Sequence, residues 1–143
     1  MSFELDERLA CDTFVIGDWP LSRVLLMNDS RWPWLILVPR RKGLVELIDL
    51  EFADQTQLMD EAGRASRFLK HRVRADKINV GSLGNIVRQL HLHIVARVDG
   101  DPAWPRPVWG HGAAAPYDVN AARELIVAAR EGLSIQLIKA AAA

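Results

Sequence analysis

This 143-residue chain has only one cysteine, Cys11. No disulfide can form within the chain, and such sparing use of cysteine fits a reducing compartment. Net charge is also lacking, because 18 basic residues balance 18 acidic ones. A nucleic-acid polymer would favour a strongly basic face, so the balance argues against that partner. A mononucleotide needs only a few local donors, so the charge balance does not argue against a mononucleotide ligand.

Long apolar runs are missing too. The longest is far short of the ~20 residues that a membrane helix needs, so we expect no membrane contact. The first twelve residues carry four acidic side chains and no long apolar stretch, so we expect no secretory signal. Half of the chain is nevertheless hydrophobic, which is enough for one core. We therefore expect a cytoplasmic protein with a single domain over residues 1–143.

Short apolar runs alternate with one long amphipathic segment, a pattern that predicts an α+β fold. We expect an antiparallel sheet of about five strands with the long helix packed on one face. The last two strands form an antiparallel hairpin around a Gly-containing turn. Residues 133–139 are ambiguous, and 140–143 form a frayed tail. The expected strands are 13–16, 24–27, 34–38, 77–80 and 86–98, and the expected helices are 5–10, 44–50 (a short turn), 52–73 and 117–132.

Gln89, His91 and His93 alternate with apolar residues in the last of these strands. A strand turns successive side chains to opposite faces, so these three share one face while the residues between them face a core. Neighbouring imidazoles on such a face lie roughly 6.5–7 Å apart. One imidazole can therefore act on a phosphorus or a metal while the next contacts an oxygen of the same group.

Two histidines on one face of a strand have three interpretations. They can form an inert hydrogen-bonded face, half of a metal site, or a catalytic pair. A metal site needs a third ligand, and no Asp or Glu lies within five residues of the pair. The remaining histidines and the cysteine are distant in sequence, so the sequence shows no ligand set for a metal. The residue pattern alone leaves all three interpretations open.

The residues around the pair resemble the histidine triad (HIT) superfamily of nucleotide hydrolases and transferases. Its signature is His-φ-His-φ-His-φ-φ, where φ is apolar, preceded by a glycine and an amide residue. Gly84 and Asn85 match that upstream pair, His91 matches the central histidine and His93 the third. The pattern looks most like bacterial HIT-domain proteins with a Gln-φ-His-φ-His core, often described as diadenosine-polyphosphate-hydrolase-like.

The resemblance covers about residues 20–98. Residues 25–29 resemble the family strand whose Asn or Asp holds the ribose, a role that the resemblance gives to Asn28. The Trp- and Pro-rich loop and the helix within 99–139 would follow this core, and Trp104 or Trp109 can wall the pocket. Three positions depart from the family pattern, namely Gln89 at the first triad position, Trp34 where a histidine is common, and Ile86 where Ser or Thr is common.

The resemblance implies that neutral His91 attacks the α-phosphorus of a nucleotide and that water then releases the nucleoside monophosphate. His93 and Asn85 would stabilise charge on the phosphoryl oxygens, Gly84 would allow close backbone approach, and Gln89 would orient the polar face. The chemistry requires no metal and no cofactor. A nucleotidyltransferase, a metal-dependent hydrolase and a nucleotide-binding regulatory protein with weak catalysis are the alternatives.

The family's small members are commonly two-fold dimers, and five tryptophans are many for a chain of this length. Tryptophan is enriched at interfaces because it buries much area and keeps a polar group. We therefore expect a homodimer, with the long helix or the Trp-rich loop as the contact. The alternative is that the tryptophans cover the core of one monomer.

Overall fold

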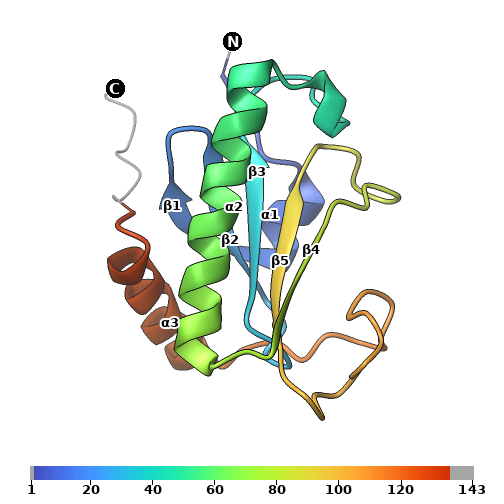
Figure 1. The fold of residues 1–143 in the computed structure, drawn as a ribbon, viewed down its shortest axis with the longest axis vertical. Helices are drawn as coiled ribbons and strands as arrows, with labels where there is room; N and C mark the ends of the chain where they lie inside the picture. Colours follow the sequence, from blue (N-terminus) through green and yellow to red (C-terminus); the bar gives the residue numbers. More distant parts are fainter. Residues whose placement is uncertain (1, 136–143) are drawn as a thin grey trace.

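The computed structural model describes residues 2–135 and has a five-stranded sheet. Helices flank this sheet (Figure 1). The strand order is β1-β2-β3-β5-β4, and every neighbouring pair is antiparallel. The predicted α+β fold with about five strands is confirmed. The elements in chain order are α1 (Glu7–Asp12), β1 (Thr13–Asp18), β2 (Ser22–Met27), β3 (Trp34–Pro39), the 3-10 helix η1 (Leu47–Asp49), α2 (Phe52–Val73), β4 (Lys77–Gly81), β5 (Leu92–Arg97) and α3 (Val119–Gly132).

The long helix has the predicted bounds, since α2 runs from Phe52 to Val73. The final helix is also confirmed, and the side chain of Asp118 caps it by accepting from the backbone N–H groups of Asn120 and Ala121. The first helix begins two residues later than predicted, because Asp6 caps it in the same way. Residues 136–143, which include the predicted tail, lie outside the described part of the chain.

The last strand is shorter than predicted, because β5 begins only at Leu92 rather than near residue 86. Residues 82–91 form a loop in which Gly84 adopts a positive φ of +70°, a conformation that breaks a ladder. The antiparallel pairing of β4 with β5 is confirmed, with Gly81 opposite His93 and Lys77 opposite Arg97. Gln89 and His91 therefore precede the strand.

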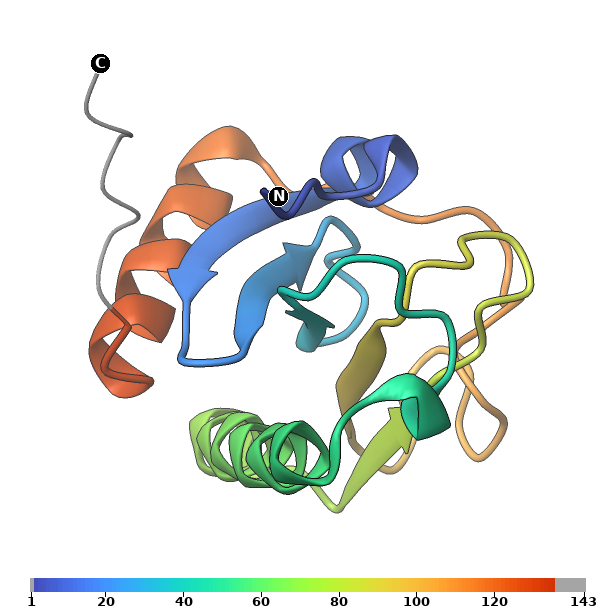
Figure 2. The same ribbon diagram turned by 90° about the horizontal axis from the view of Figure 1, so that it is seen from above.

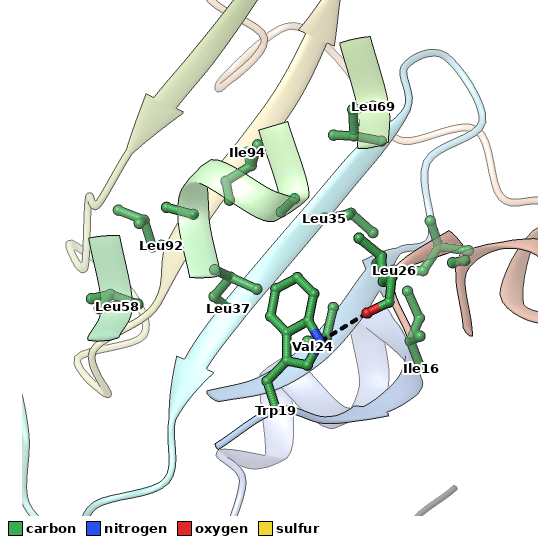
Figure 3. Packing of buried hydrophobic residues seen from close by; sticks show 14 of the residues in the cluster. Ile16, Trp19, Val24, Leu26, Leu35, Leu37, Leu58, Leu69, Leu92 and Ile94 are labelled. Atoms are coloured by element: carbon green, nitrogen blue, oxygen red, sulfur yellow. Dashed lines mark hydrogen bonds between the residues drawn. The ribbon is translucent and has the colours of Figure 1, made fainter. Parts of the chain in front are cut away.

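One apolar cluster lies between the sheet and the helices α2 and α3 (Figure 3). Leu92 and Ile94 of β5 belong to it, as do Leu58 and Leu69 of α2. The indole N–H of Trp19 donates to the backbone carbonyl of Leu133 across 3.1 Å, which ties the end of α3 to this cluster. Apolar burial of this kind is the main force that holds the layers together.

A second apolar cluster lies on the opposite face of the sheet, beneath α1 and the loop that follows β5. Figure 2 shows α1 and α2 on opposite sides of the sheet. Leu9 of α1 and Val95 of β5 belong to this cluster. Because side chains alternate along a strand, His93 points to the same face as Val95. The polar face that the sequence predicted is therefore the face covered by α1.

Arg97 is buried to 1% exposure at the end of β5 and anchors the loop that follows. Its guanidinium donates to both carboxylate oxygens of Asp101, at 2.7 and 3.0 Å, and to the amide oxygen of Asn79 at 2.9 Å. These contacts fix the start of the Trp- and Pro-rich segment. Among residues 2–135, no helix is both long enough and apolar enough to cross a membrane.

Candidate active site

His91 and His93 line a cavity of about 410 Å³ on the face of the sheet covered by α1. Segments far apart in sequence form its wall. Residues of α1, the ends of β2 and β3, the loop 82–91 and the segment 108–114 all contribute. The fold thus brings the two histidines together with the loop that the sequence linked to them.

His91 is held by its own segment of backbone. Its Nδ1 lies 2.6 Å from the backbone carbonyl oxygen of Gln89. A carbonyl only accepts hydrogen bonds, so Nδ1 must carry the proton. In the neutral ring, Nε2 then keeps its lone pair. The contact therefore places the lone pair of a neutral His91 ring on Nε2.

His93 is held by a side chain of the neighbouring strand. The indole N–H of Trp34, in β3, donates to Nδ1 of His93 across 3.0 Å. An indole N–H only donates, so Nδ1 of His93 must carry the lone pair and Nε2 the proton. Burial, together with the adjacent His91, lowers the pKa of His93 to about 3. His93 is therefore a neutral hydrogen-bond donor at neutral pH.

The two imidazoles thus present opposite tautomers. Their ring centroids are 4.8 Å apart and the planes meet edge to face at 69°. This is closer than the spacing expected on a regular strand, because His91 lies just before β5 and outside strand geometry. One ring offers a lone pair and the other offers an N–H, which suits attack on a phosphorus whose oxygens need a donor.

The predicted phosphate loop reaches the cavity as well. Gly84 and Asn85 both line the wall beside the histidines. The positive φ of Gly84 favours glycine, as the loop requires. The amide of Asn85 makes no hydrogen bond with the described residues, so it is available to a ligand.

Gln89 and Asn28 lie outside the cavity wall. The Gln89 amide bonds the N-terminal segment instead, donating to the carbonyl of Glu4 at 2.8 Å and accepting from the N–H of Asp6 at 2.9 Å. The amide oxygen of Asn28 accepts from the backbone N–H of Tyr117 at 2.8 Å. Both side chains thus serve contacts that are distant in sequence, which the local pattern did not reveal.

Asp29, next to Asn28, lines the wall where the sequence analysis placed a ribose contact. Its carboxylate accepts from Nε and Nη2 of Arg31 at 2.9 and 2.8 Å. Burial alone would raise the pKa of Asp29, but the hydrogen bonds from Arg31 outweigh burial and lower it. Asp29 is therefore an ionised acceptor at the cavity wall. The sequence signal for it was the resemblance of residues 25–29 to the family strand whose Asn or Asp holds the ribose.

Of the two loop tryptophans, Trp109 reaches the cavity and Trp104 does not. The Trp109 ring lies 5.6 Å from the ring of His93, centroid to centroid. Trp109 also packs on Gly81, where an added Cβ would lie 3.1 Å from its ring. Trp104 stacks instead beside the guanidinium of Arg97 at 5.6 Å. Among residues 2–135, no group of three or more His, Cys, Asp or Glu side chains is placed to hold a metal ion.

Residues 8–100 match the protein family described as HIT domain. The chain is 49% identical to a histidine triad protein from Bradyrhizobium japonicum, with a TM-score of 0.90 over 93% of this chain and 99% of that one. A histidine triad protein from Sinorhizobium meliloti is 48% identical, with a TM-score of 0.88 over 91% and 96% of the two chains. One from Marinobacter aquaeolei is 43% identical, with a TM-score of 0.91 over 94% and 98%.

The fold, the His-x-His segment and these matches define one class of protein, and the chain belongs to the histidine triad family. No curated protein matched the chain.

Proposed function

We propose that this protein hydrolyses nucleotides at the α-phosphorus through a nucleotidyl intermediate on Nε2 of His91. The substrate class is a dinucleoside polyphosphate or a related nucleotide conjugate. The observation that carries the proposal is the pair of opposite tautomers, because a free lone pair and a neutral N–H face one cavity. Members of the family are typically nucleotide hydrolases or transferases, which agrees with this chemistry.

In the first step, Nε2 of His91 forms a bond to the α-phosphorus, and the bond from phosphorus to the leaving-group oxygen breaks with its electron pair. The ring becomes positively charged, and the carbonyl of Gln89 at Nδ1–H stabilises that charge. Nε2–H of His93 and the amide of Asn85 donate to the non-bridging oxygens as negative charge builds on them. Gly84 lets the loop backbone approach the phosphate.

In the second step, water adds to the phosphorus and the phosphorus–nitrogen bond breaks. The electron pair returns to Nε2 of His91, the water gives up a proton to solvent, and the nucleoside monophosphate leaves. Asp29, which lines the cavity, would accept from the ribose hydroxyls, in the role that the family resemblance gave to Asn28. Trp109 supplies an apolar wall beside the reacting groups.

The test is a substrate panel of diadenosine polyphosphates, adenosine 5′-phosphoramidate and nucleotide sugars. His91→Ala should lower kcat by about 10³-fold or more with an unchanged circular dichroism spectrum. His93→Ala should lower it less, about 10²-fold, because it removes a donor but not the nucleophile. His71→Ala is the matched control, since His71 is an exposed histidine of α2 outside the cavity.

The intermediate can be trapped directly. A substrate labelled in its α-phosphate should leave label on the protein after a denaturing quench in base, and His91→Ala should carry none. Activity of His91→Ala within a few-fold of the parent would sink the assignment. Nucleotide binding without turnover or label would instead favour a regulatory protein. Transfer of the label to an added alcohol or phosphate in preference to water would favour a transferase.

Neither step needs a metal, because imidazole is the nucleophile and the donors are protein groups. Dialysis against a chelator should therefore leave kcat unchanged. Full loss of activity on chelation, restored by zinc or manganese, would overturn the proposed mechanism and favour the metal-dependent alternative.

A further inference from the structure

Gln89, at the first position of the triad motif, fastens two parts of the chain that are more than eighty residues apart. Its amide nitrogen donates to the carbonyl of Glu4 and its amide oxygen accepts from the N–H of Asp6. A primary amide makes this two-point contact because it carries a donor and an acceptor side by side. An imidazole offers a single nitrogen towards any one side and could not reproduce the contact.

The fastened segment leads directly into α1. Asp6 is the N-cap of α1, and its carboxylate accepts from the N–H groups of Arg8 and Leu9. Leu9 is buried against the second apolar cluster. The apolar contact presses α1 onto the sheet, and the amide contact of Gln89 fixes where α1 begins. As a result, Arg8, Leu9 and Asp12 become part of the wall of the histidine cavity.

The cationic side chains of that wall differ in how many protein oxygens they already bind. The cavity wall contains two cations, Arg8 and Arg31. Arg31 is committed to protein oxygens, since it donates to Asp29 and to the backbone carbonyl of His111. Among the described residues the only ion pair of Arg8 is with Asp12, and the 3.9 Å from its Nε to that carboxylate is too long for a hydrogen bond. Its side chain is 62% exposed. Arg8 is therefore the wall cation that remains able to bind a ligand.

We propose that Gln89 is a positioning residue that docks α1, and that Arg8 binds the phosphate groups beyond the α-phosphate of the substrate. The site would thereby select nucleotides whose leaving group is a charged phosphate over conjugates with a neutral leaving group. This inference rests on the proposed function at His91, and it assigns the first triad position to substrate selection instead of chemistry.

The first arm of the test measures binding by calorimetry with two probes, adenosine 5′-(α,β-methylene)diphosphate and AMP. The parent should bind the diphosphate analogue about tenfold more tightly than AMP, as expected for one extra charge-assisted contact. Arg8→Gln should remove most of this ratio and leave the affinity for AMP unchanged. Asp12→Asn should keep or widen the ratio, because it removes a repelling carboxylate. Arg123→Gln, which removes the same charge from an exposed site on α3, should change neither affinity.

The second arm concerns Gln89. Gln89→Glu keeps an acceptor for Asp6 but places a carboxylate against the carbonyl of Glu4, so α1 should come loose. Hydrogen exchange in residues 6–12 should become faster and the binding ratio should fall. KM should rise several-fold more with diadenosine tetraphosphate than with adenosine 5′-phosphoramidate.

Each outcome of these measurements tests a different part of the proposal. An unchanged ratio in Arg8→Gln, or an equal loss for both probes, overturns the role of Arg8 while the proposed function stands. Faster exchange in Gln89→Glu with an unchanged ratio overturns the link between Gln89 and Arg8. A fall in kcat for both substrates without faster exchange places Gln89 in the chemistry. A parent protein that binds neither probe overturns the proposed function as well.

Discussion

The indole N–H of Trp34 donates to Nδ1 of His93 across 3.0 Å, and this contact sets the proton position on a buried imidazole. Trp34 stands where a histidine is common in the family. A histidine there could either donate or accept, whereas an indole can only donate. The substitution therefore restricts His93 to one neutral tautomer, with its proton at Nε2.

Removal of the Trp34 N–H should allow His93 to change its tautomer. Trp34→Phe keeps an aromatic ring but has no N–H, so we expect His93 to populate both neutral forms. Nitrogen chemical shifts of the imidazole, measured by NMR, report the tautomer directly. The parent should show a single form with the proton at Nε2, and kcat of the variant should fall by about tenfold or less because some donor remains.

Trp109→Phe is the matched control for the NMR measurement. Trp109 also touches the His93 ring, but its buried N–H has no hydrogen-bond partner among the described residues. The tautomer of His93 should therefore be the same in this variant as in the parent. A single Nε2–H form that persists in Trp34→Phe would show that something other than Trp34 sets the proton.

The low pKa of His93 should make folding stability depend on pH. The unfolded chain takes up a proton on this imidazole below about pH 6.5, whereas the folded protein does so only near 3, because burial disfavours the charged ring. The folding stability that comes from keeping His93 neutral is fully present above about pH 6.5 and is lost as the pH falls below that value. Between pH 7 and 4.5, the free energy of unfolding should drop by about 2 kcal/mol from this group.

Urea unfolding at a series of pH values measures this dependence, and His93→Gln supplies the comparison because glutamine does not titrate. The variant should lose less stability than the parent over the same range. Parallel curves for the two proteins would mean that His93 is protonated equally in the folded and unfolded states.

The alternation of residues in the last strand was enough to predict its two faces. Leu92 and Ile94 pack towards α2 and His93 faces the cavity, because period-two patterning is a property of any strand. The helix at 52–73 was predictable for a similar reason, since its apolar stripe is long and regular. Local periodicity was therefore enough to predict these elements of the fold.

The contacts of Gln89 and Asn28 could not be predicted in this way. Each amide bonds a backbone group more than eighty residues distant, and no local pattern encodes such a partner. Alternation alone therefore predicted Gln89 on the histidine face, and the family resemblance gave the ribose to Asn28. The strand was predicted to begin near residue 86, which is too early, because the strand propensity of residues 86–91 is overridden by the positive φ of Gly84 and by tertiary contacts.

Glu61 is a third residue whose role only the structure reveals. It sits within α2 at 1% exposure, and its carboxylate accepts from the N–H groups of Leu21 and Ser22 at 3.0 and 2.9 Å. Glu61→Ala would leave two buried donors without an acceptor, so it should cost about 2–4 kcal/mol of stability. Glu61→Gln keeps an acceptor oxygen for one of them and should cost less.

The measurement is equilibrium unfolding in urea, with Asp60→Ala as the control from the neighbouring position of α2. Asp60 pairs with Arg64 at the surface, where both side chains are more than half exposed, so its removal should change little. Equal effects of the two alanine variants would show that the carboxylate of Glu61 does not hold the turn between β1 and β2.

The homodimer stays a prediction, but the structure removes the tryptophans that are buried within one chain as a reason for it. Trp32 and Trp34 are buried within the single chain, so these tryptophans cover the core of one monomer, as the alternative interpretation held. Of the two predicted dimer contacts, the long helix α2 is a better candidate than the Trp-rich loop. Beside it, η1 and the edge strand β4 form an apolar groove in which Ile48 is 85% exposed and Met59 is 73% exposed. An edge strand also leaves backbone groups open for pairing with a second copy.

Light scattering at micromolar concentration should therefore give twice the 16.0 kDa of one chain. A two-fold dimer repeats each contact, so one substitution places two charges in the interface. Ile48→Glu combined with Met59→Glu should yield a folded monomer, because burying four unpaired carboxylates in an apolar contact is costly. Val127→Glu, at an exposed apolar position on α3, should leave the mass unchanged. A parent mass near that of one chain would reject the dimer, and an unchanged mass in the double variant would reject this groove as its contact.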